Sequence, residues 1–549
     1  MEALNQALGT VAGYVWGLPL IVLLVGTGVL LSITLKFIQI RRYGLAVKII
    51  SGRYDDPSET GEVSHFRALT SALSGTIGLG NIAGVAVAIS LGGPGALFWM
   101  WITALFGMAT KYATCLLANR YRTVHEDGSV SGGPMYTIEN AMGKSWKPLA
   151  AAFAVFTIGA SFGMANLFQS NQVASSLYEA FSVPTWATGL GIVVFVALVI
   201  IGGIKRIGAV TGRLVPLMCG IYIVAAIVVL ILKAEAVPDA FALIFTTAFT
   251  GVEPAAGGFA GIAFWIVLQQ GVRRGTFSNE AGLGSAPIAH AAAKTREPVR
   301  EGLVAMMGPF IDTITICTMT ALVIISTGTW KLGSPPKVKA SFYSAATAEA
   351  PAVERGPTIR EAYDRGGDLR GTDVRWTGEV FVVQKMAFED RVGLHLGGGM
   401  RESCFAVFPR SLGAADELQG GERITIQGKL HGDVGGAVLT TFAFSTVFGE
   451  WGGVLIIIGI LFFALSTIIT WSYYGDRAAM YLFGPRGVLP YRILYVIVIF
   501  IGAIYTLDAV VNISDILNGL MAIPNLIVTL VLLPKVIAMT RDYLERHRG

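Results

Sequence analysis

The sequence predicts an all-α polytopic membrane protein with about 11 transmembrane helices. Of its 549 residues, 53% are hydrophobic and only 14% are charged. Charged residues make up roughly 25% of an average soluble domain, so most of this chain has no surface that faces water. In addition, apolar runs of about 20 residues recur along the chain, and each can cross roughly 30 Å of hydrocarbon.

The predicted spans follow one another closely, with one long interruption after the eighth. They lie near residues 14–36, 66–90, 95–118, 148–172, 184–203, 210–232, 256–272, 300–327, 453–474, 490–507 and 511–534. The residues before the first span include one acidic residue and no basic one. A secretory signal begins with basic residues and has a shorter apolar stretch, so we expect the first span to be retained.

Basic residues gather in alternate loops and predict the orientation. One set of loops and the C-terminal tail carry Arg41, Arg42, Lys48, Arg53, Arg120, Arg122, Lys144, Lys147, Lys205, Arg206, Arg213, Arg273, Arg274, Lys294, Arg296, Arg477, Arg486, Arg492, Lys535, Arg541, Arg546 and Arg548. The opposite loops, near 91–94, 173–183 and 233–239, carry almost only Lys233. Because loops rich in Lys and Arg stay in the cytoplasm, we expect a multi-pass protein of the cell inner membrane with its N-terminus outside and its C-terminus inside.

Residues 333–436 interrupt the membrane pattern and divide the membrane part into 1–332 and 437–549. The interruption opens with Ser334-Pro335-Pro336 and carries many charges of both signs. Alternation of apolar and polar residues, with glycine-rich turns between the runs, predicts several short strands. They lie at 376–383, 391–396, 403–408 and 423–430, with a helix-like piece at 411–418. This order is typical of a small Greek-key barrel, which we expect outside the cell.

The insert resembles the oligonucleotide/oligosaccharide-binding (OB) fold, in a variant similar to the tRNA-anticodon type. The likeness rests on Tyr363-Asp364, on residues 371–380 and on the closing run 424–429. A protein that binds nucleic acid needs a basic groove with aromatic platforms. The charges of the insert are balanced and its aromatic residues fall mostly at core-facing positions. We therefore expect a structural or gate-covering module that binds no nucleic acid, and its partner is left open.

Catalytic motifs are absent from the sequence. It contains no HExxH, no GxSxG and no phosphate-binding loop that opens a helix after a strand. We therefore expect no enzymatic activity. The chemically informative residues are instead helix-breaking residues inside the apolar spans.

The second span carries such residues at its centre, in the run Ser74-Gly75-Thr76-Ile77-Gly78-Leu79-Gly80-Asn81. Irregular backbone at membrane depth is tolerated only where it lines a cavity or is buried in protein. Freed amides can bind a carboxylate, helped by the positive end of the following half-helix, and freed carbonyls can bind a cation or an ammonium group. The alternative is close helix packing through small residues. Thr76 and Asn81 favour a binding site, because apolar residues would pack at lower cost.

A second glycine-rich run, Gly257-Gly258-Phe259-Ala260-Gly261, lies in the seventh span and leads into residues 271–282. Paired broken segments in the two halves of a chain point to a transporter binding site. The two runs begin two sets of five spans with opposite topology, which predicts a 5+5 inverted repeat plus one extra N-terminal helix. We interpret Arg273, Arg274 and Glu280 as a cytoplasmic ionic cluster that either gates the site or anchors a loop.

Polar residues inside two other apolar spans are further candidates. Ser466 and Thr467 lie in the middle of the ninth span, where their hydroxyls and nearby freed carbonyls would suit Na⁺, a hard cation. The alternative is that each hydroxyl bonds a carbonyl of its own helix. Asp312 lies within the eighth span, and an ionisable residue there is a functional hypothesis by default. It would serve a cation, a proton or a fixed polar contact.

Five runs of the sequence carry a family resemblance. They are GGPGALFWMWITALFG at 92–107, SGGPMY at 131–136, FSNEAGLGSAP at 277–287, FGEWGG at 448–453 and WSYYG at 471–475. These runs resemble the motifs of the alanine or glycine:cation symporter family. The likeness covers nearly all of 1–330 and 437–549, whereas the insert departs from the family pattern.

The resemblance implies a leucine-transporter-type fold and roles for the candidate residues. It implies that the amides of Leu79 and Gly80, beside Gly78, hold the substrate carboxylate, and that the Thr76 carbonyl and Asn81 lie by the amino group and any first cation. The implied sodium ligands are the carbonyls of Ser74, Ile77 and Phe463 and the hydroxyls of Ser466 and Thr467. The implied side-chain pocket is lined by Phe259, Ala260, Gly261 and Trp471, and is reached by Gln169 or Gln172.

The resemblance thus implies a secondary active symporter that imports alanine or glycine with Na⁺ or H⁺ by alternating access. Its expected partners are the amino acid, the coupling ion and the lipid bilayer, and no cofactor besides Na⁺ is expected. Two other classes stay open. One is a non-transporting membrane sensor that uses the external β domain, and the other is a channel. The sequence favours the symporter, because a sensor has no need to keep an ion site.

Overall fold

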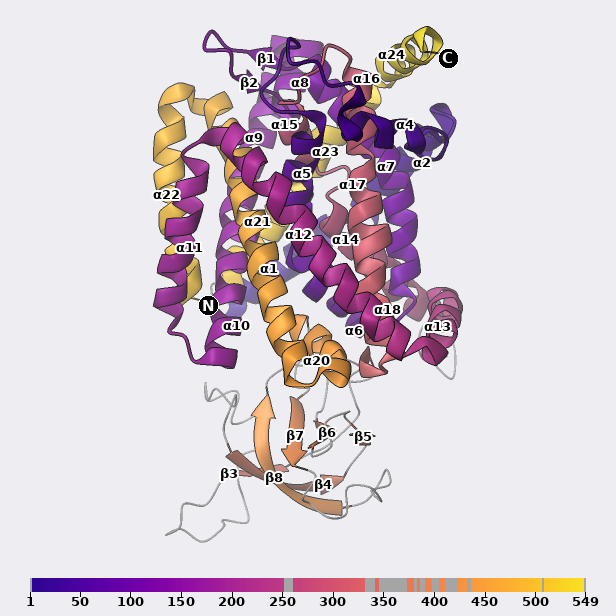
Figure 1. The fold of residues 1–549 in the computed structure, drawn as a ribbon, viewed down its shortest axis with the longest axis vertical. Coiled ribbons are helices and arrows are strands. Elements are labelled where there is room, and N and C mark those ends of the chain that lie inside the picture. The colour runs from indigo at the N-terminus through magenta and orange to yellow at the C-terminus, as the bar shows by residue number, and fades with distance from the viewer. Residues whose placement is uncertain are drawn as a thin grey trace.

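The computed structural model describes residues 2–250, 260–330, 436–505 and 508–547, and between 331 and 435 only the strand residues named below. Long helices run roughly parallel and form a bundle (Figure 1). We call the end of the bundle that carries helices α8 and α24 the C-terminal face. We call the opposite end, which carries α13 and α20, the strand face.

The helices of the first half are mostly long and apolar, with short π- and 3₁₀-helical pieces between them. They are α1 (Glu2–Val15), α2 (Leu18–Thr34), α3 (Ile38–Arg41), α4 (Tyr43–Lys48), η1 (Ile49–Arg53), α5 (His65–Thr76), η2 (Gly80–Gly84), α6 (Val85–Gly92), α7 (Ala96–Arg120), α8 (Pro134–Met142), η3 (Lys144–Trp146), α9 (Lys147–Phe162), η4 (Gly163–Leu167), α10 (Phe168–Phe181), α11 (Thr185–Ile200), α12 (Gly203–Leu232), η5 (Ala234–Ala236) and α13 (Val237–Thr250). The two-residue strands β1 (Thr123–Val124) and β2 (Val130–Ser131) form a hairpin at the C-terminal face.

The second half has the same character. Its helices are α14 (Ala260–Asn279), α15 (Ala286–His290), α16 (Pro298–Ala305), α17 (Met307–Pro309), η6 (Phe310–Cys317), α18 (Thr318–Ser326), α20 (Ala437–Phe448), α21 (Glu450–Phe483), α22 (Pro485–Ile504), α23 (Asp508–Val531) and α24 (Leu533–Arg546). Helices α13 and α20 were not among the predicted elements.

In the described part of the chain, eight helices are long and apolar enough to cross a membrane, and a ninth span results if the bent pair α5 and η2–α6 is counted as one. Helices α11 and α14 coincide with two further predicted spans, at 184–203 and 256–272. The predicted helical polytopic class is confirmed, whereas the total of about eleven spans stays a prediction.

The outer helices present apolar side chains where a soluble protein would present polar ones. On α12, Leu217, Val224 and Ile231 are 56%, 62% and 67% exposed, while Val215, Tyr222 and Val229 on the other face are buried. Exposed apolar stripes of this kind suit contact with lipid chains. The inner helices α7 and α21 are largely buried and provide the scaffold of the site.

Six strands are described between residues 341 and 431. They are β3 (Ser341–Ser344), β4 (Asp373–Glu379), β5 (Val383–Lys385), β6 (Arg391–Leu396), β7 (Cys404–Pro409) and β8 (Arg423–His431). They form one antiparallel sheet in the order β3-β4-β8-β7-β6-β5, beyond the strand face of the bundle (Figure 1). Strands β4, β6, β7 and β8 overlap the four predicted strands, and β5 meets the first of these only at Val383. Strand β3 was not predicted, and the helix predicted at 411–418 lies outside the described residues.

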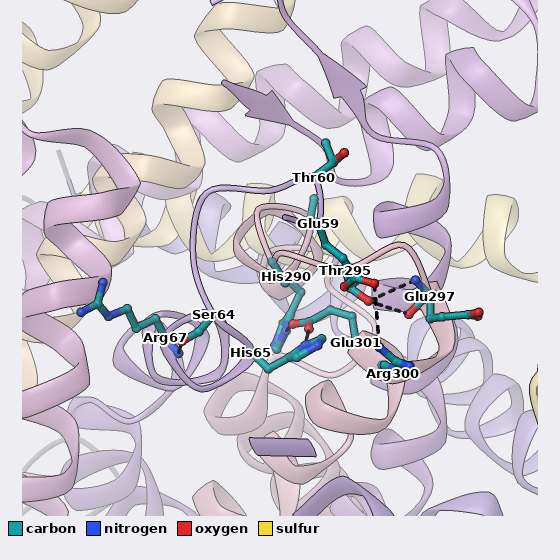
Figure 2. Close-up of polar contacts among 12 residues, drawn as sticks. Glu59, Thr60, Ser64, His65, Arg67, His290, Thr295, Glu297, Arg300 and Glu301 are labelled. Atoms are coloured by element: carbon teal, nitrogen blue, oxygen red, sulfur yellow. Dashed lines mark hydrogen bonds and ion pairs between the residues drawn. The ribbon is translucent and has the colours of Figure 1, made fainter. Parts of the chain in front are cut away.

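A buried polar cluster ties three helices together near the C-terminal face. Figure 2 shows His65, at the start of α5, and His290, at the end of α15, on either side of Glu301 in α16. One carboxylate oxygen of Glu301 contacts Nδ1 of His65, and the other lies 2.5 Å from Nδ1 of His290. All three side chains are buried, so the cluster fixes the relative positions of α5, α15 and α16.

Backbone contacts beside this cluster join the segments that flank α5 and α15. Val63 and Ala293 form a parallel β-bridge. The guanidinium of Arg122 donates four hydrogen bonds of 2.6–2.8 Å to the carbonyls of Ala291, Ala293, Thr60 and Thr295. Burial lowers the pKa of Arg122, but an arginine stays charged in proteins, so these bonds are charge-assisted. These contacts therefore hold the segments before α5 and after α15 together at the C-terminal face.

Candidate functional site

The second predicted span is broken at its centre. Helix α5 ends at Thr76, Ile77 has extended dihedral angles (φ −75°, ψ 98°), and the helix resumes at Gly80 with an axis bent by 53°. The Gly78 amide, which the break frees from the helix, donates to Oδ1 of Asn81 over 2.9 Å. A Cβ atom on Gly78 would lie 2.5 Å from Oγ1 of Thr467. Glycine is therefore required for the broken segment to approach α21 this closely, and the predicted break is confirmed.

A cavity with an empty volume of about 380 Å³ lies beside the break. It is lined by Gly75, Thr76, Gly78, Leu79, Gly80, Met164, Ala165, Gln169, Phe277, Glu280, Thr467, Trp471 and Asn518. Eight of these residues were candidate site residues from the sequence, and they come from segments as far apart in the chain as α5 and α21. Two buried amide oxygens at its wall, Oε1 of Gln169 and Oδ1 of Asn518, have no hydrogen-bond partner in the described part of the chain.

Five oxygen atoms converge between α5 and α21. Oγ of Ser466 lies 3.2, 3.4 and 2.9 Å from the carbonyl oxygens of Ser74, Ile77 and Phe463. Oγ1 of Thr467 lies 3.0 Å from the same Phe463 carbonyl. The two hydroxyls and the carboxyl-terminal end of α5 are therefore one group of neutral oxygens, which is the donor set that hard cations prefer. No group of three or more His, Cys, Asp or Glu residues that would hold a transition metal occurs among the described residues.

Asp312 lies on the other side of the break and holds Asn81. Its Oδ1 accepts from Nδ2 of Asn81 over 2.7 Å, and its Oδ2 accepts from the hydroxyls of Ser278 and Thr313 over 2.8 and 2.7 Å. All four side chains are buried. Asp312 sits in the π-helical stretch η6, a local geometry often found at functional sites. Through Asn81 it positions Gly78, so its contacts favour a role in shaping the broken segment.

A second break follows α14, at residues 280–284. The predicted run is described only from Ala260 and Gly261, which begin α14, while Phe259 and the residues before it lie outside the described part. The helix continues to Asn279, and the backbone then turns through Glu280, Gly282 and Gly284 with φ values of 55°, 92° and 92°. Positive φ is unusual for glutamate, so packing and hydrogen bonds, not local preference, hold this turn.

The predicted ionic cluster of Arg273, Arg274 and Glu280 is wrong. Glu280 is buried at the cavity, where its Oε1 accepts from the Trp471 indole over 3.0 Å and its Oε2 accepts from the Ser285 hydroxyl over 2.5 Å. Arg273 instead forms an ion pair of 2.6 Å with Asp515. Among the described residues no ion pair joins Glu280 to either arginine, because Arg273 and Arg274 lie on earlier turns of α14.

The Arg273–Asp515 pair lies toward the strand face, not toward the C-terminal face. Asp515 belongs to the first turns of α23, and Trp16, which packs beside Arg273, directly precedes α2. Both α2 and α23 run from there to the C-terminal face (Figure 1). The indole of Trp16 also donates to the Asp515 carbonyl over 3.2 Å. The pair therefore lies toward the end of the bundle opposite the His65–Glu301–His290 cluster.

Comparison with known proteins identifies the family of the chain. A sequence model described as the sodium:alanine symporter family matches residues 1–353 and 423–549. The chain belongs to this family. A sodium/alanine symporter, AgcS, of Methanococcus maripaludis is 39% identical over 542 residues, which cover 98% of this chain and 97% of the relative. An uncharacterized transporter of Haemophilus influenzae is 37% identical over 545 residues, with 99% and 97% covered.

The chain was also compared with solved structures. The chain matches MhsT in complex with L-phenylalanine with a TM-score of 0.49 at 12% identity, over 88% of this chain and 93% of that one. The family model leaves residues 354–422 unmatched. This gap falls inside the insert, so every described residue of the cavity and of the five-oxygen group belongs to the part that the sodium:alanine symporter family shares.

Several cavity residues of this symporter were not predicted. Met164 and Ala165 face the cavity from η4, a π-helical stretch within the fourth predicted span, and an apolar sequence gives no sign of such a stretch. Phe277 and Asn518 also line the cavity. Of the two predicted glutamines, Gln169 lines the cavity and Gln172 does not. In the sequence, only the glycine pair Gly282 and Gly284 could have indicated the second break. These glycines lie in a run that the sequence analysis interpreted as a loop.

Proposed function

We propose that this chain is a secondary active symporter that imports a small neutral amino acid, alanine or glycine, together with Na⁺ by alternating access. The observation that carries the proposal is the convergence of a broken helix, a cavity and five neutral oxygens at one place inside the bundle. Membership of the sodium:alanine symporter family and the name of the Methanococcus maripaludis relative support the choice of substrate and ion.

The substrate carboxylate binds the start of the half-helix at Leu79 and Gly80. The first amides of a helix have no partner within the helix, and the positive end of its dipole favours an anion. The ammonium group faces the Thr76 carbonyl and the unpartnered oxygens of Gln169 and Asn518. A donor that reaches these oxygens would remove the cost of leaving them unpaired, which is about 1–3 kcal/mol for each buried group.

Na⁺ binds between the carbonyls of Ser74, Ile77 and Phe463 and the hydroxyls of Ser466 and Thr467. The two hydroxyls donate to these carbonyls, and rotation of the two hydroxyl hydrogens away from them would leave all five oxygens free to bind the ion. The site uses both α5 and α21. Na⁺ therefore favours the arrangement in which these two helices are together, and the substrate site beside Gly78 is formed in the same arrangement. This sharing makes ion and substrate binding mutually favourable, a coupling that is reciprocal.

The proposed architecture is a leucine-transporter-type 5+5 repeat. Its first set runs from the broken pair α5 and α6 to α12, its second from the broken pair α14 and α15 to α23, and α2 is the extra helix. Both sets begin with a broken span, which favours an inverted repeat around a central site. The C-terminal face, which carries most of the basic loops, is cytoplasmic in the cell inner membrane, and H⁺ is the alternative coupling ion.

The insert at 333–436 is a separate extracytoplasmic domain, between the transporter core segments 1–332 and 437–549. The strand order, with β8 between β4 and β7, is compatible with an OB-like barrel. Its position beyond the strand face (Figure 1) favours a structural or gate-covering role, with a partner that is not assigned. An alternative function, a membrane sensor that reads a ligand through this domain, would need no sodium site.

Uptake of labelled alanine into proteoliposomes tests the proposed function. With an inward Na⁺ gradient and the purified protein, alanine is expected to accumulate inside above its external concentration, and the accumulation should disappear when K⁺ replaces Na⁺. An H⁺ gradient in place of the Na⁺ gradient separates the two coupling ions. Binding without accumulation would indicate a sensor, and uptake that stops at equal concentrations would indicate a channel; both results refute the proposal.

A further inference from the structure

Glu280 and Trp471, which both line the cavity, form a buried contact that substrate binding alone does not explain. Trp471 lies one helical turn after Thr467, so both side chains project from the same face of α21. The indole is 4% exposed, and its ring packs edge-on against Tyr474 at 5.3 Å between centroids. Its only polar atom, the N–H, donates to Oε1 of Glu280 over 3.0 Å. The apolar part of the indole is thus left to form a wall of the cavity.

Glu280 itself is held from several sides. Its Oε2 accepts from the Ser285 hydroxyl over 2.5 Å, and the next amide, of Ala281, donates to Oδ1 of Asn279 over 2.9 Å. The turn around it has no free space. A Cβ atom on Gly282 would lie 2.7 Å from Leu24, and one on Gly284 would lie 2.8 Å from Phe153. The carboxylate therefore has a fixed position, and it fixes the indole in turn.

Both carboxylate oxygens of Glu280 already have a protein donor. An ammonium group of the substrate would have to compete with these donors, whereas the oxygens of Gln169 and Asn518 have no partner in the described part of the chain. The arrangement favours a residue that positions a wall over one that binds the substrate directly.

We propose that Glu280 sets the upper size limit of the substrate side chain, because its carboxylate fixes the indole of Trp471 in the cavity wall. This inference rests on the proposed function and deepens it. A fixed indole admits a hydrogen or a methyl group and excludes a branched chain. Without the carboxylate, the indole N–H of Trp471 would be buried and unpaired. The indole would therefore turn toward another acceptor or toward water, and this movement would enlarge the cavity. Glu280 is therefore a positioning residue for specificity.

The test is the ratio of leucine binding to alanine binding by the full-length protein at saturating Na⁺, measured for the wild type and matched variants. Glu280→Ala is expected to raise the ratio about tenfold, the scale at which apolar pockets discriminate size. Trp471→Phe is expected to raise it similarly, with no further rise in the double variant, since the two residues act as one unit. Glu280→Gln keeps an acceptor oxygen for the indole and is expected to hold the ratio within about twofold.

Ser285→Ala keeps the test decisive if Glu280→Ala does not fold. Ser285 is not among the residues that line the cavity, so a change in the ratio can arise only through Glu280, and a smaller rise in the same direction is expected. Ser472→Ala is the matched control. It removes a hydroxyl beside Trp471 that donates to the Ile469 carbonyl over 2.6 Å, and the ratio should not change.

Two results overturn the inference. Equal loss of alanine and leucine binding in Glu280→Ala, with an unchanged ratio, would mean that the carboxylate binds the ammonium group common to all amino acids. An unchanged ratio in Ser285→Ala and Trp471→Phe would mean that the indole does not limit size. Failure of the wild type to bind alanine with Na⁺ refutes the proposed function instead, so the two failures are distinguishable.

Discussion

Replacement of Thr467 by valine tests the proposed sodium site most sharply, because it removes one ligand and almost no volume. In the described part of the chain, Oγ1 of Thr467 bonds the Phe463 carbonyl of its own helix alone, at 3.0 Å, so the loss of this bond costs the ion-free variant about 0.5–1.5 kcal/mol. With the ion bound it loses a contact to a charge, which contributes about 1.5–3 kcal/mol. The difference between the two losses is about 1–1.5 kcal/mol, so the Na⁺ concentration for half-maximal uptake should rise about 5- to 13-fold.

The assay is initial alanine uptake as a function of Na⁺ concentration, with the maximal rate at saturating Na⁺ recorded separately. Thr470→Val is the matched control, because it makes the same change one turn further along α21. The Thr470 hydroxyl donates to the Ser71 carbonyl over 3.1 Å, away from the five-oxygen group. The control should stay within about twofold of the wild type. An equal shift in both variants, or no shift in Thr467→Val, would refute the sodium assignment.

Three further perturbations follow from the same contacts. Gly78→Ala adds a methyl group that would lie 2.5 Å from Oγ1 of Thr467, an overpacking that costs about 1–3 kcal/mol. A direct binding assay should therefore show weaker Na⁺-dependent affinity for alanine. Gly84→Ala is the control: its methyl group meets open space, so this variant should bind alanine as the wild type does. Glu301→Ala leaves the two buried imidazoles of His65 and His290 without their acceptor. Thermal unfolding in detergent should show that the free energy of unfolding falls by about 2–5 kcal/mol. An unchanged unfolding midpoint would contradict the role of this cluster. Deletion of residues 354–422, the part that the family model leaves unmatched, should preserve sodium-driven alanine uptake; complete loss of uptake in a protein that still reaches the membrane would show that the insert belongs to the transport machinery.

The first half of the site was predictable because its residue types are incompatible with an ordinary membrane helix. Gly78 and Gly80 weaken the helix, and Asn81 adds a polar group that must be satisfied; the structure breaks the helix at this place and uses Asn81 to bind the freed Gly78 amide. Ser466 was identified for a similar reason, since a hydroxyl in an apolar span needs a partner. Local composition was sufficient in these cases because the cost of burying polar groups in hydrocarbon is large.

The second half was harder because tertiary contacts decide it. Nothing in the residue type of Glu280 predicts a left-handed backbone or a place at the cavity, and its charge suggested a loop. Its position results from the Trp471 indole, nearly 200 residues later in the chain, and from Ser285. The π-helical turn that brings Met164 to the cavity depends in the same way on a distant partner, since the Met164 amide bonds Oγ of Ser514 over 2.7 Å. Such contacts join segments whose proximity only the fold establishes.

The central claim is that the broken segment from Thr76 to Gly80 binds the amino acid beside a sodium ion. A structure determined with alanine and Na⁺ tests it most directly. We expect the alanine carboxylate within hydrogen-bonding distance of the Leu79 and Gly80 amides, and the ion among the carbonyl and hydroxyl oxygens between α5 and α21. A continuous helix through residues 76–80, or alanine bound elsewhere with the cavity beside Trp471 empty, would contradict the claim.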